Sequence, residues 1–456
     1  MSEPFRMEHD TMGDVKVPAS ALYGAQTQRA VENFPISRLR FSRRFLRALG
    51  TIKSAAARTN ARLGVVPEEL ASAIARAADE VAEGLHDSQF VVDVFQTGSG
   101  TSTNMNANEV IAARASKMLD GAKVHPNDHV NASQSSNDVF PTALHLAAGD
   151  AVHGALLRCL ERLQEALETK SREFWDVLKI GRTHLQDAVP MRLGQEFSGY
   201  ARQVELSRQR ILAAMEGIYE LPLGGTAVGS GLNAPEGFAA GVIGMLAEST
   251  SLPWREAPNH FEAQAARDAV SFLSGALKTC ALSLTKIAND VRWLGSGPRC
   301  GLGELKLPEV QPGSSIMPGK VNPVIAESLL MVCAQVVGHD AAISWCCASG
   351  SFELNMMMPL MAFDLLESIE LLAAGAANFA SKCIDGLEAN RERIEELMEQ
   401  SLALVTALTP EIGYDRAAGI AKLAASSGRT IREVAEKESG LPPERLAALL
   451  DPRTMV

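Results

Sequence analysis

The feature that most constrains the fold of this chain is helical periodicity in long apolar segments. Lys278 is the only charged residue from 269 to 285, and Glu327 is the only one from 323 to 338. A helix that is apolar on all sides is stable only when other helices surround it. The first segment keeps steps of four and three throughout, at Leu273, Leu277, Cys280, Leu284, Ile287, Val291 and Leu294. We therefore predict an all-α protein with a long central helical bundle, in which other subunits bury some of the helices.

The remaining helical patterns suggest three domains. Two shorter amphipathic helices are predicted at about 42–62 and 67–86, and a third carries an apolar stripe at Val152, Leu156, Leu160, Leu163 and Leu167. From about residue 389 the pattern changes to short, charged helices separated by turn signals. We predict an N-terminal domain, a central long-helix domain and a small C-terminal helical domain, with the bounds 1–133, 134–388 and 389–456.

Charge and cysteine content narrow the classes of partner. The 456 residues carry a formal charge of −11, so no general basic field exists to hold nucleic acid or an anionic membrane. A small anionic substrate would need a locally positive pocket. The seven cysteines include no CxxC pair, which argues against a disulfide framework and against a zinc or iron–sulfur site. They are typical of reduced thiols in a cytosol-like compartment.

The N-terminal segment, residues 1–18, lacks the apolar core of a signal peptide and the Arg/Ser-rich character of a transit peptide. The uncharged stretches 94–108 and 221–235 are polar and shorter than a membrane span. We therefore expect a soluble, cytoplasmic protein with no membrane partner.

Four polar segments, expected to be loops, contain the candidate chemistry. The first, residues 96–108, precedes a helical pattern that begins at Glu109. Ser99 and Thr101 offer hydroxyls, and Gly100 allows backbone N–H groups to approach an anion at a helix start. The segment lacks the third glycine of a dinucleotide-binding fingerprint. Both an ordinary capped loop and an anion site remain open.

The second segment, residues 125–138, ends in three residues that are favoured at helix N-caps: Ser135, Ser136 and Asn137. His125 and His129 are four residues apart, but Pro126 disfavours a helix there. A metal site on one helix face is therefore disfavoured. Solvated loop histidines and an anion contact are the alternatives.

The third segment, residues 181–190, holds His184 between a hydroxyl and amide side chains. A structural histidine and a general acid/base are both compatible with this setting. The functional reading rests on the ability of histidine to donate and accept a proton at neutral pH.

The fourth segment, residues 313–323, resembles a phosphate loop but is not one, because Val321 follows Lys320 where Ser or Thr is required. Asn322 and Pro323 suit the N-cap and the first position of a helix. Lys320 would then lie beside a helix N-terminus, which combines two positive features. The alternative is a mobile surface loop without a function.

Four motifs in this order resemble the class II, iron-independent fumarate hydratases of the fumarase/aspartase superfamily: TGSGTSTNMNANEV, HPNDHVNASQSSNDVFPTA, GRTHLQDAVP and GSSIMPGKVNP. The resemblance extends over essentially the whole chain, from VPASALYGAQTQRAVENFPIS to SLALVTALTPEIGYDRAA. It implies an all-α, three-domain subunit in a homotetramer whose central helices form a twenty-helix core. It also implies active sites at subunit corners, built from loops of three subunits, and a reversible hydration of fumarate to (S)-malate without cofactor or metal.

The resemblance also assigns roles. Ser314 matches the base that removes the C3 proton of (S)-malate, and His184 matches the acid/base residue at the hydroxyl. Lys320 and Asn322 are matched to stabilisation of the aci-carboxylate, and Glu327 to the acidic partner of the histidine, with a carboxylate facing the helix dipole as its structural alternative. A serine acts as a base only when N–H donors and a cation stabilise its alkoxide. The candidate substrate contacts are Ser99, Gly100, Thr101, Ser135, Ser136, Asn137, Thr183, Ser315, Lys320, Val321 and Asn322.

Three positions favour water over ammonia as the group that is eliminated. Aspartate-specific relatives usually carry Gln at His184, Ser-Thr-Asn at Ser135–Asn137 and Ala at Gly319. The segment 189–197, by contrast, resembles the ammonia lyases. The alternatives are therefore aspartate ammonia-lyase, or another C4-dicarboxylate lyase of the superfamily, and a non-catalytic structural protein of the kind found among lens crystallins. The structural protein would be expected to lose Ser314, His184 or Lys320.

A second, non-catalytic anion site exists in the family. The matching residues here are His125, Pro126, Asn127 and Asp128. The segment that precedes them, residues 119–124, is shorter than in many fumarases.

Overall fold

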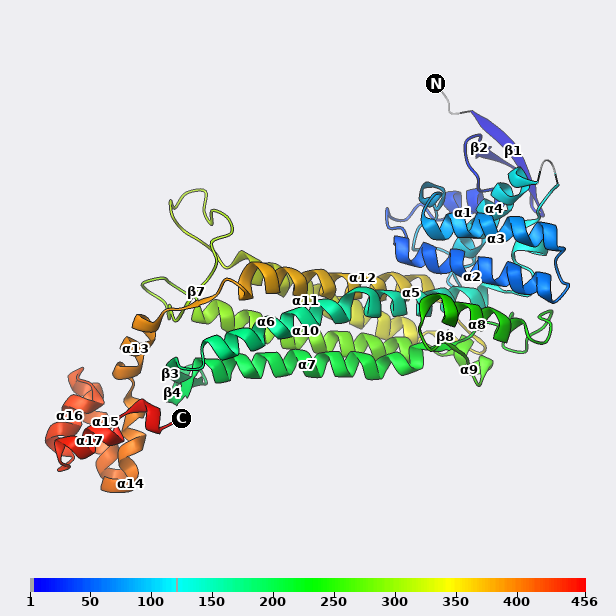
Figure 1. Ribbon diagram of the computed structural model, residues 1–456. Helices are drawn as coiled ribbons and strands as arrows, with labels where there is room; N and C mark the ends of the chain where they lie inside the picture. Colours follow the sequence, from blue (N-terminus) through cyan, green and yellow to red (C-terminus); the bar gives the residue numbers. More distant parts are fainter. Residues whose placement is uncertain (1–3, 120–121) are drawn as a thin grey trace. The chain divides into compact units, whose positions relative to one another are not determined.

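The computed structural model describes residues 4–119 and 122–456, and Figure 1 shows their helices and strands. Two expectations fall partly on residues outside this description. The N-terminal segment 1–18 includes residues 1–3, and the short segment 119–124 includes residues 120 and 121. The chain divides into two compact units. Unit 1 contains the residues up to Arg158, Gln209–Ala281 and Ala334–Ala373, and unit 2 contains Cys159–Arg208, Leu282–Cys333 and Ala374–Val456.

Unit 1 begins with a β-hairpin, in which β1 (Phe5–Asp10) pairs antiparallel with β2 (Gly13–Pro18). Helix α2 (Arg43–Arg62) packs against α3 (Glu68–Glu83), as Figure 1 shows, and both confirm predicted helices. The other elements of unit 1 are α1 (Ala25–Asn33), η1 (Asp87–Gln89), α4 (Thr101–Met118), η2 (Pro126–Val130), α5 (Ser136–Ala151), η3 (Val152–Leu156), β5 (Glu220–Leu221), α8 (Phe238–Thr250), β6 (Arg255–Glu256), α9 (His260–Ala265), β8 (Gly350–Ser351) and β9 (Leu354–Asn355).

Five helices contain the boundary between the units: α6 (Leu157–Glu173), α7 (Leu193–Ile218), α10 (Asp268–Leu294), α11 (Val324–Cys347) and α12 (Met358–Phe379). Every residue of the apolar stripe from Leu273 to Leu294 is buried, as is the stripe from Val152 to Leu167. The mostly helical architecture confirms the predicted fold class. The three-domain division remains a prediction.

Large apolar side chains on the other faces of the long helices are exposed in the single chain. Phe272 and Trp293 of α10 are 63% and 56% exposed, and Trp345 of α11 is 73% exposed. Of the described helices, α11 alone is long and apolar enough to cross a membrane, a property that the core helix of a soluble protein can share. These three aromatic side chains therefore lie at the surface of the described single chain.

Unit 2 contains the predicted short C-terminal helices. Their buried core includes Leu408, Ile420, Ile431, Val434 and Leu450. The remaining elements of this unit are β3 (Leu178–Thr183), β4 (Gln186–Arg192), β7 (Leu305–Lys306), η4 (Ala380–Ile384), β10 (Glu388–Ala389), α13 (Arg391–Gln400), η5 (Leu402–Leu408), α14 (Thr409–Ile412), α15 (Tyr414–Ser427), α16 (Ile431–Glu438), α17 (Pro443–Leu449) and η6 (Pro452–Thr454).

Local expectations were wrong at three places before residue 200, and a further one, at Asn322, is described with the site below. Helix α4 begins at Thr101 rather than at Glu109, because Gly100 takes a left-handed conformation with φ 75° and N-caps the helix there. Residues 181–190 form most of the β3–β4 hairpin rather than a loop. Pro126 does not prevent a helical turn, because it occupies the first position of the π-helical turn η2, where no N–H is needed.

Candidate active site

The first candidate segment makes a tight approach to its neighbours at the start of α4. A Cβ atom on Gly98 would lie 1.8 Å from Met356 O, and one on Gly100 would lie 2.0 Å from the ring of Phe140. Ser99 lies between these glycines, and its Oγ is 2.7 Å from Oγ1 of Thr101, the residue after Gly100. Only glycine fits at these two positions, which explains the Gly-Ser-Gly sequence.

The second segment starts α5 with a capping box. Ser135 Oγ accepts from Asn137 N, and the Asp138 carboxylate accepts from Ser135 N at 2.9 Å. Asn137 Nδ2 donates to Ala227 O at 2.8 Å. Ser135 is therefore the N-cap of α5, which confirms the N-cap expectation for one of the three polar residues.

The N-termini of α4 and α5 meet in unit 1. Asn104 Nδ2 donates to Ser136 Oγ at 3.0 Å, and Gly100 abuts the Phe140 ring. In the described chain, the backbone N–H groups of Thr101 and Ser136 have no acceptor. Two helix dipoles with free N–H groups and several hydroxyls are groups that suit an anion.

The HPND segment forms the turn η2. Asp128 N donates to His125 Nδ1 at 3.1 Å, and His125 N donates to His129 Nδ1 at 3.0 Å. The Asp128 carboxylate lies 3.2 Å from His125. The two histidines thus serve first as local acceptors that hold the turn.

Thr183 and His184 lie at the tip of the β3–β4 hairpin, where Thr183 pairs with Gln186. The two turn residues, His184 and Leu185, have φ values of 56° and 60°. Positive φ at both positions is the geometry of a type I′ hairpin turn, which usually needs Asn or Gly. His184 is exposed and, in the described part of this single chain, makes no hydrogen bond or ion pair.

A buried ionic cluster supports the hairpin. Arg182 Nη2 donates to Glu304 Oε1 at 2.7 Å, and Lys179 Nζ lies 3.4 Å from both Glu304 and Glu196. The Glu304 side chain is fully buried. Burial raises the pKa of the Glu196 carboxyl, and Lys179 lowers it in part. Because Arg182 precedes Thr183, the cluster fixes the base of the turn that presents His184.

The fourth segment closes on itself. Gly313 N donates to Lys320 O at 2.8 Å, and Asn322 Nδ2 donates to Gly313 O at 2.6 Å. Within this closed loop, Ser314 Oγ accepts from two backbone N–H groups, those of Ile316 at 3.2 Å and Met317 at 2.9 Å. Two such donors stabilise negative charge on the serine oxygen.

The helix after this loop begins one residue later than expected. The assigned helix α11 starts at Val324, and Pro323 O accepts from Glu327 N at 3.1 Å. Asn322 is therefore not the N-cap, because its side-chain amide donates to the loop instead. Lys320 and Glu327 both line a cavity of about 760 Å³ in unit 2, together with Gly319, Val321, Asn322 and Pro323.

The candidates thus form separate groups within this chain. Unit 1 brings together Ser99, Gly100, Thr101, Ser135, Ser136 and Asn137. Unit 2 holds the hairpin tip and the 313–323 loop, and the described residues show no hydrogen bond between Glu327 and His184. Among residues 4–119 and 122–456, no group of three or more His, Cys, Asp or Glu side chains is arranged to hold a metal ion.

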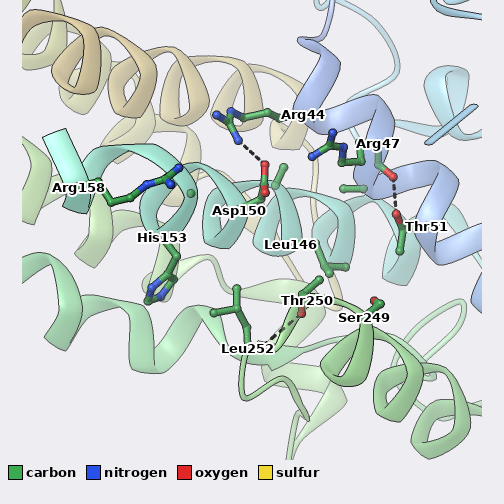
Figure 2. Close-up of a pocket in the computed structure, with 13 residues that line it drawn as sticks. Arg44, Arg47, Thr51, Leu146, Asp150, His153, Arg158, Ser249, Thr250 and Leu252 are labelled. Atoms are coloured by element: carbon green, nitrogen blue, oxygen red, sulfur yellow. Dashed lines mark hydrogen bonds and ion pairs between the residues drawn. The ribbon is translucent and has the colours of Figure 1, made fainter. Parts of the chain in front are cut away.

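A further cavity of about 520 Å³ in unit 1 has no candidate among its lining residues. Figure 2 shows the Arg44 guanidinium pointing toward Asp150, with which it pairs, and Arg44 Nε also lies 3.3 Å from Glu370. Two carboxylates therefore offset the charge of Arg44. The other lining cations, Arg47 and Arg158, are exposed.

Sequence reasoning missed three buried ionisable residues next to the candidates: Lys53, Asp138 and Glu304. Lys53 and Glu304 are fully buried, and Asp138 accepts from Ser135 N, Gly224 N and Thr226 N. One signal was present for Lys53, because it lies on α2 next to Ile52 and Ser54–Ala57, which form a nearly uncharged, buried stretch. Glu304 carried no such signal.

Known proteins are similar to this chain over nearly its whole length. Residues 13–338 match the Lyase family, and residues 404–456 match the Fumarase C C-terminus family. The chain is 55% identical over 447 residues to the class II fumarate hydratase of Mycobacterium tuberculosis, which covers 98% of this chain and 94% of the relative. It is 54% identical over 456 residues to that of Ralstonia nicotianae, with 99% of each chain covered.

Among solved structures, the recombinant class II fumarase of Schistosoma mansoni superposes with a TM-score of 0.96 at 42% identity and covers 99% of both chains. Fold, motifs and whole-length identity point the same way, and the chain belongs to the class II fumarate hydratases (EC 4.2.1.2).

Proposed function

We propose that this fumarate hydratase converts (S)-malate to fumarate with Ser314 as the base and His184 as the acid. Ser314 Oγ takes the C3 proton, and the electron pair of the C–H bond moves into the neighbouring carboxylate as an aci-carboxylate. Collapse of this intermediate forms the C2–C3 double bond and breaks the C2–O bond, while His184 protonates the departing hydroxyl so that water leaves. Hydration runs through the same steps in reverse.

The observation that carries this proposal is the position of Ser314 Oγ as acceptor for Ile316 N and Met317 N. These N–H groups meet the requirement that a serine base be stabilised as an alkoxide. Lys320 supplies a cation from the same closed loop, and Asn322 holds the loop shut through Gly313 O. Ser315 and Val321 flank these residues, and Glu327 acts as the acidic partner of the histidine.

Substrate binding is assigned to the paired helix N-termini of unit 1. The hydroxyls of Ser99, Thr101 and Ser136 and the free N–H groups at the starts of α4 and α5 suit a carboxylate. Ser135, Asn137 and Gly100 shape this surface, and Thr183 contributes from the hairpin. The turn His125–Asp128 is the proposed second anion site.

We propose that the active form is a homotetramer whose long helices build a twenty-helix core. The exposed Phe272, Trp293 and Trp345 support this assembly, because a core of that kind would cover them. The isolation of His184 within one chain also supports it, because each site would take its loops from three subunits. The proposed location is the cytoplasm, and the reaction needs no cofactor, nucleic acid or membrane.

One assay separates this function from its alternatives. The purified protein is given malate and then aspartate, and the ultraviolet absorbance of fumarate is followed. Fumarate formed from malate and not from aspartate supports a hydratase. Formation from aspartate alone would assign the chain to the ammonia lyases, and no formation from either substrate would favour a structural protein.

A further inference from the structure

A lysine is buried beneath the proposed substrate-binding surface of unit 1. Lys53 lies on α2 with no exposed area, between Ile52 and Ser54, which are also buried. An ammonium group is costly to bury unless it is hydrogen-bonded. The hydrogen-bond partners of the buried Lys53 amino group therefore indicate its role.

The Lys53 ammonium holds one short turn. Its Nζ donates to Asn131 Oδ1 and to Gln134 Oε1, each at 3.0 Å. The same turn is closed by Gln134 N, which donates to Asn131 O at 3.1 Å, and by Asn131 Nδ2, which donates to Gln134 O at 3.2 Å. Lys53 thus joins the two ends of the turn to α2.

This turn leads directly into the start of α5. Ser135, the N-cap, follows Gln134 in the chain, and Asn131 Oδ1 also accepts from Asn104 Nδ2 at 3.2 Å. The same Asn104 amide donates to Ser136 Oγ. One set of hydrogen bonds therefore runs from Lys53 through Asn131 and Asn104 to a hydroxyl of the proposed substrate surface.

Hydrogen-bond acceptors and a nearby carboxylate surround the buried amino group of Lys53. Asn104 Oδ1 and Asn108 Oδ1 are buried and accept no hydrogen bond from a described residue, whereas Asn131 Oδ1 accepts from Lys53, Asn104 and Asn108. Burial lowers the pKa of Lys53 to about 7, and the nearby Asp138 carboxylate raises it. Asp138 itself accepts from Ser135 N, so the opposite charge lies at the same helix start.

We propose that Lys53 is a positioning residue for substrate binding: through Asn131 and Gln134 it holds the turn that sets Ser135, Ser136 and Asn137 against the substrate carboxylate. Lys53 touches no substrate. This inference rests on the proposed role of the α5 start in substrate binding. Lys53 then affects the affinity for substrate and not the proton transfers assigned to unit 2.

The test compares two buried lysines. Lys53→Met keeps the length of the side chain and removes the donors, and it is expected to raise KM for malate about tenfold while kcat changes less than about threefold. Lys170→Met is the matched control, because Lys170 is also buried but bonds to Glu173 and Leu387 O. The control is expected to lose thermal stability without a change in KM. An unchanged KM in assembled Lys53→Met protein, or an equal rise in both variants, overturns the inference.

A second variant tests the same connection without altering the lysine. Gln134→Leu removes one acceptor at a partly exposed position and is expected to raise KM severalfold with little change in kcat. In the double variant with Lys53→Met, KM should rise no further than in Lys53→Met alone, because both changes release the same turn. An unchanged KM in Gln134→Leu, or multiplicative effects in the double variant, overturns the inference even if Lys53→Met fails to fold.

Ser136→Ala separates this inference from the proposed function of the surface. If Ser136→Ala leaves KM unchanged, the α5 start does not bind substrate, and the assignment of the surface fails. If Ser136→Ala raises KM and Lys53→Met does not, the surface assignment stands and the role of Lys53 fails.

Discussion

Replacement of Gly100 by alanine tests the contact between the two helix starts. Gly100 has φ 75°, a left-handed conformation that costs an alanine about 1–2 kcal/mol. The new Cβ would lie 2.0 Å from Phe140 Cδ2. The Phe140 ring is fully buried, and its centroid lies 4.9 Å from that of Phe45 and 5.7 Å from that of Phe41. Since the ring cannot move without displacing both neighbours, overpacking adds about 1–3 kcal/mol.

The sum predicts a loss of about 2–5 kcal/mol in the free energy of unfolding for Gly100→Ala. Gly64→Ala is the matched control, because Gly64 has φ 71° and open space around a Cβ atom. It isolates the backbone cost, about 1–2 kcal/mol, which the reduced freedom of the unfolded alanine partly offsets. The assay is urea unfolding followed by circular dichroism at one protein concentration, with the midpoint and slope compared between variants.

The KM for malate also distinguishes Gly100→Ala from Gly64→Ala. A shift of Phe140 moves α5, so Gly100→Ala is expected to raise KM for malate, whereas Gly64→Ala leaves KM unchanged. Equal losses of stability in the two variants would refute the steric argument. A normal KM in Gly100→Ala would show that the start of α5 tolerates the displacement of the ring.

Four shorter predictions concern the chemistry, the assembly and the buried lysine. Ser314→Ala lowers turnover by about two to four orders of magnitude. The control Ser381→Ala keeps normal turnover, because the Ser381 hydroxyl donates, among the described residues, only to backbone oxygens of its own helix region, such as Ala377 O. Normal turnover in Ser314→Ala removes Ser314 from the mechanism. Refolding Ser314→Ala chains with inactive His184→Asn chains is expected to restore about a quarter of the sites, because each site of the proposed tetramer takes the two residues from different subunits. Hybrid tetramers without activity contradict shared sites. Exhaustive chelation leaves activity unchanged, since no metal takes part in the proposed chemistry, and a loss that an added metal reverses speaks against it. The pKa of Lys53 is about 7 in the native state and about 10.4 in the unfolded chain, so only the unfolded chain holds this proton between those pH values. The stability of the wild-type protein relative to Lys53→Met therefore rises from pH 7 to pH 10. A difference in urea midpoint between the two proteins that stays flat or falls over this range contradicts the burial of the lysine.

The long helices could be predicted because burial imposes a period that no loop maintains. The stripe from Leu273 to Leu294 and the helices near 42–62 and 67–86 appear in the structure with small shifts at their ends. The start of α4 could not be predicted, because Asn104, Asn106 and Asn108 have low helix propensity and are stabilised there by burial and side-chain partners. Tertiary contacts outweigh local preference at such positions.

The hairpin that carries His184 escaped prediction for a related reason. Its two turn residues take positive φ without being Gly or Asn, so the usual turn signal is missing. The backbone is held instead by an ionic cluster in which Lys179 and Arg182 of β3 pair with Glu304, a residue that is distant in the chain. Candidate side chains could be named from motifs, whereas groups such as Glu304 that help to orient them lie far away in sequence and carry no local pattern.

The exposed aromatic side chains of α10 and α11 bear on how the amount of active enzyme depends on the concentration of the chain. If four chains must associate before Phe272, Trp293 and Trp345 leave water, mass action makes the concentration of tetramer vary with the fourth power of the free-chain concentration. A modest dilution then removes activity more steeply than it removes protein. Specific activity then becomes a measure of assembly. Chains released by dilution expose these aromatic side chains, at which irreversible aggregation can begin.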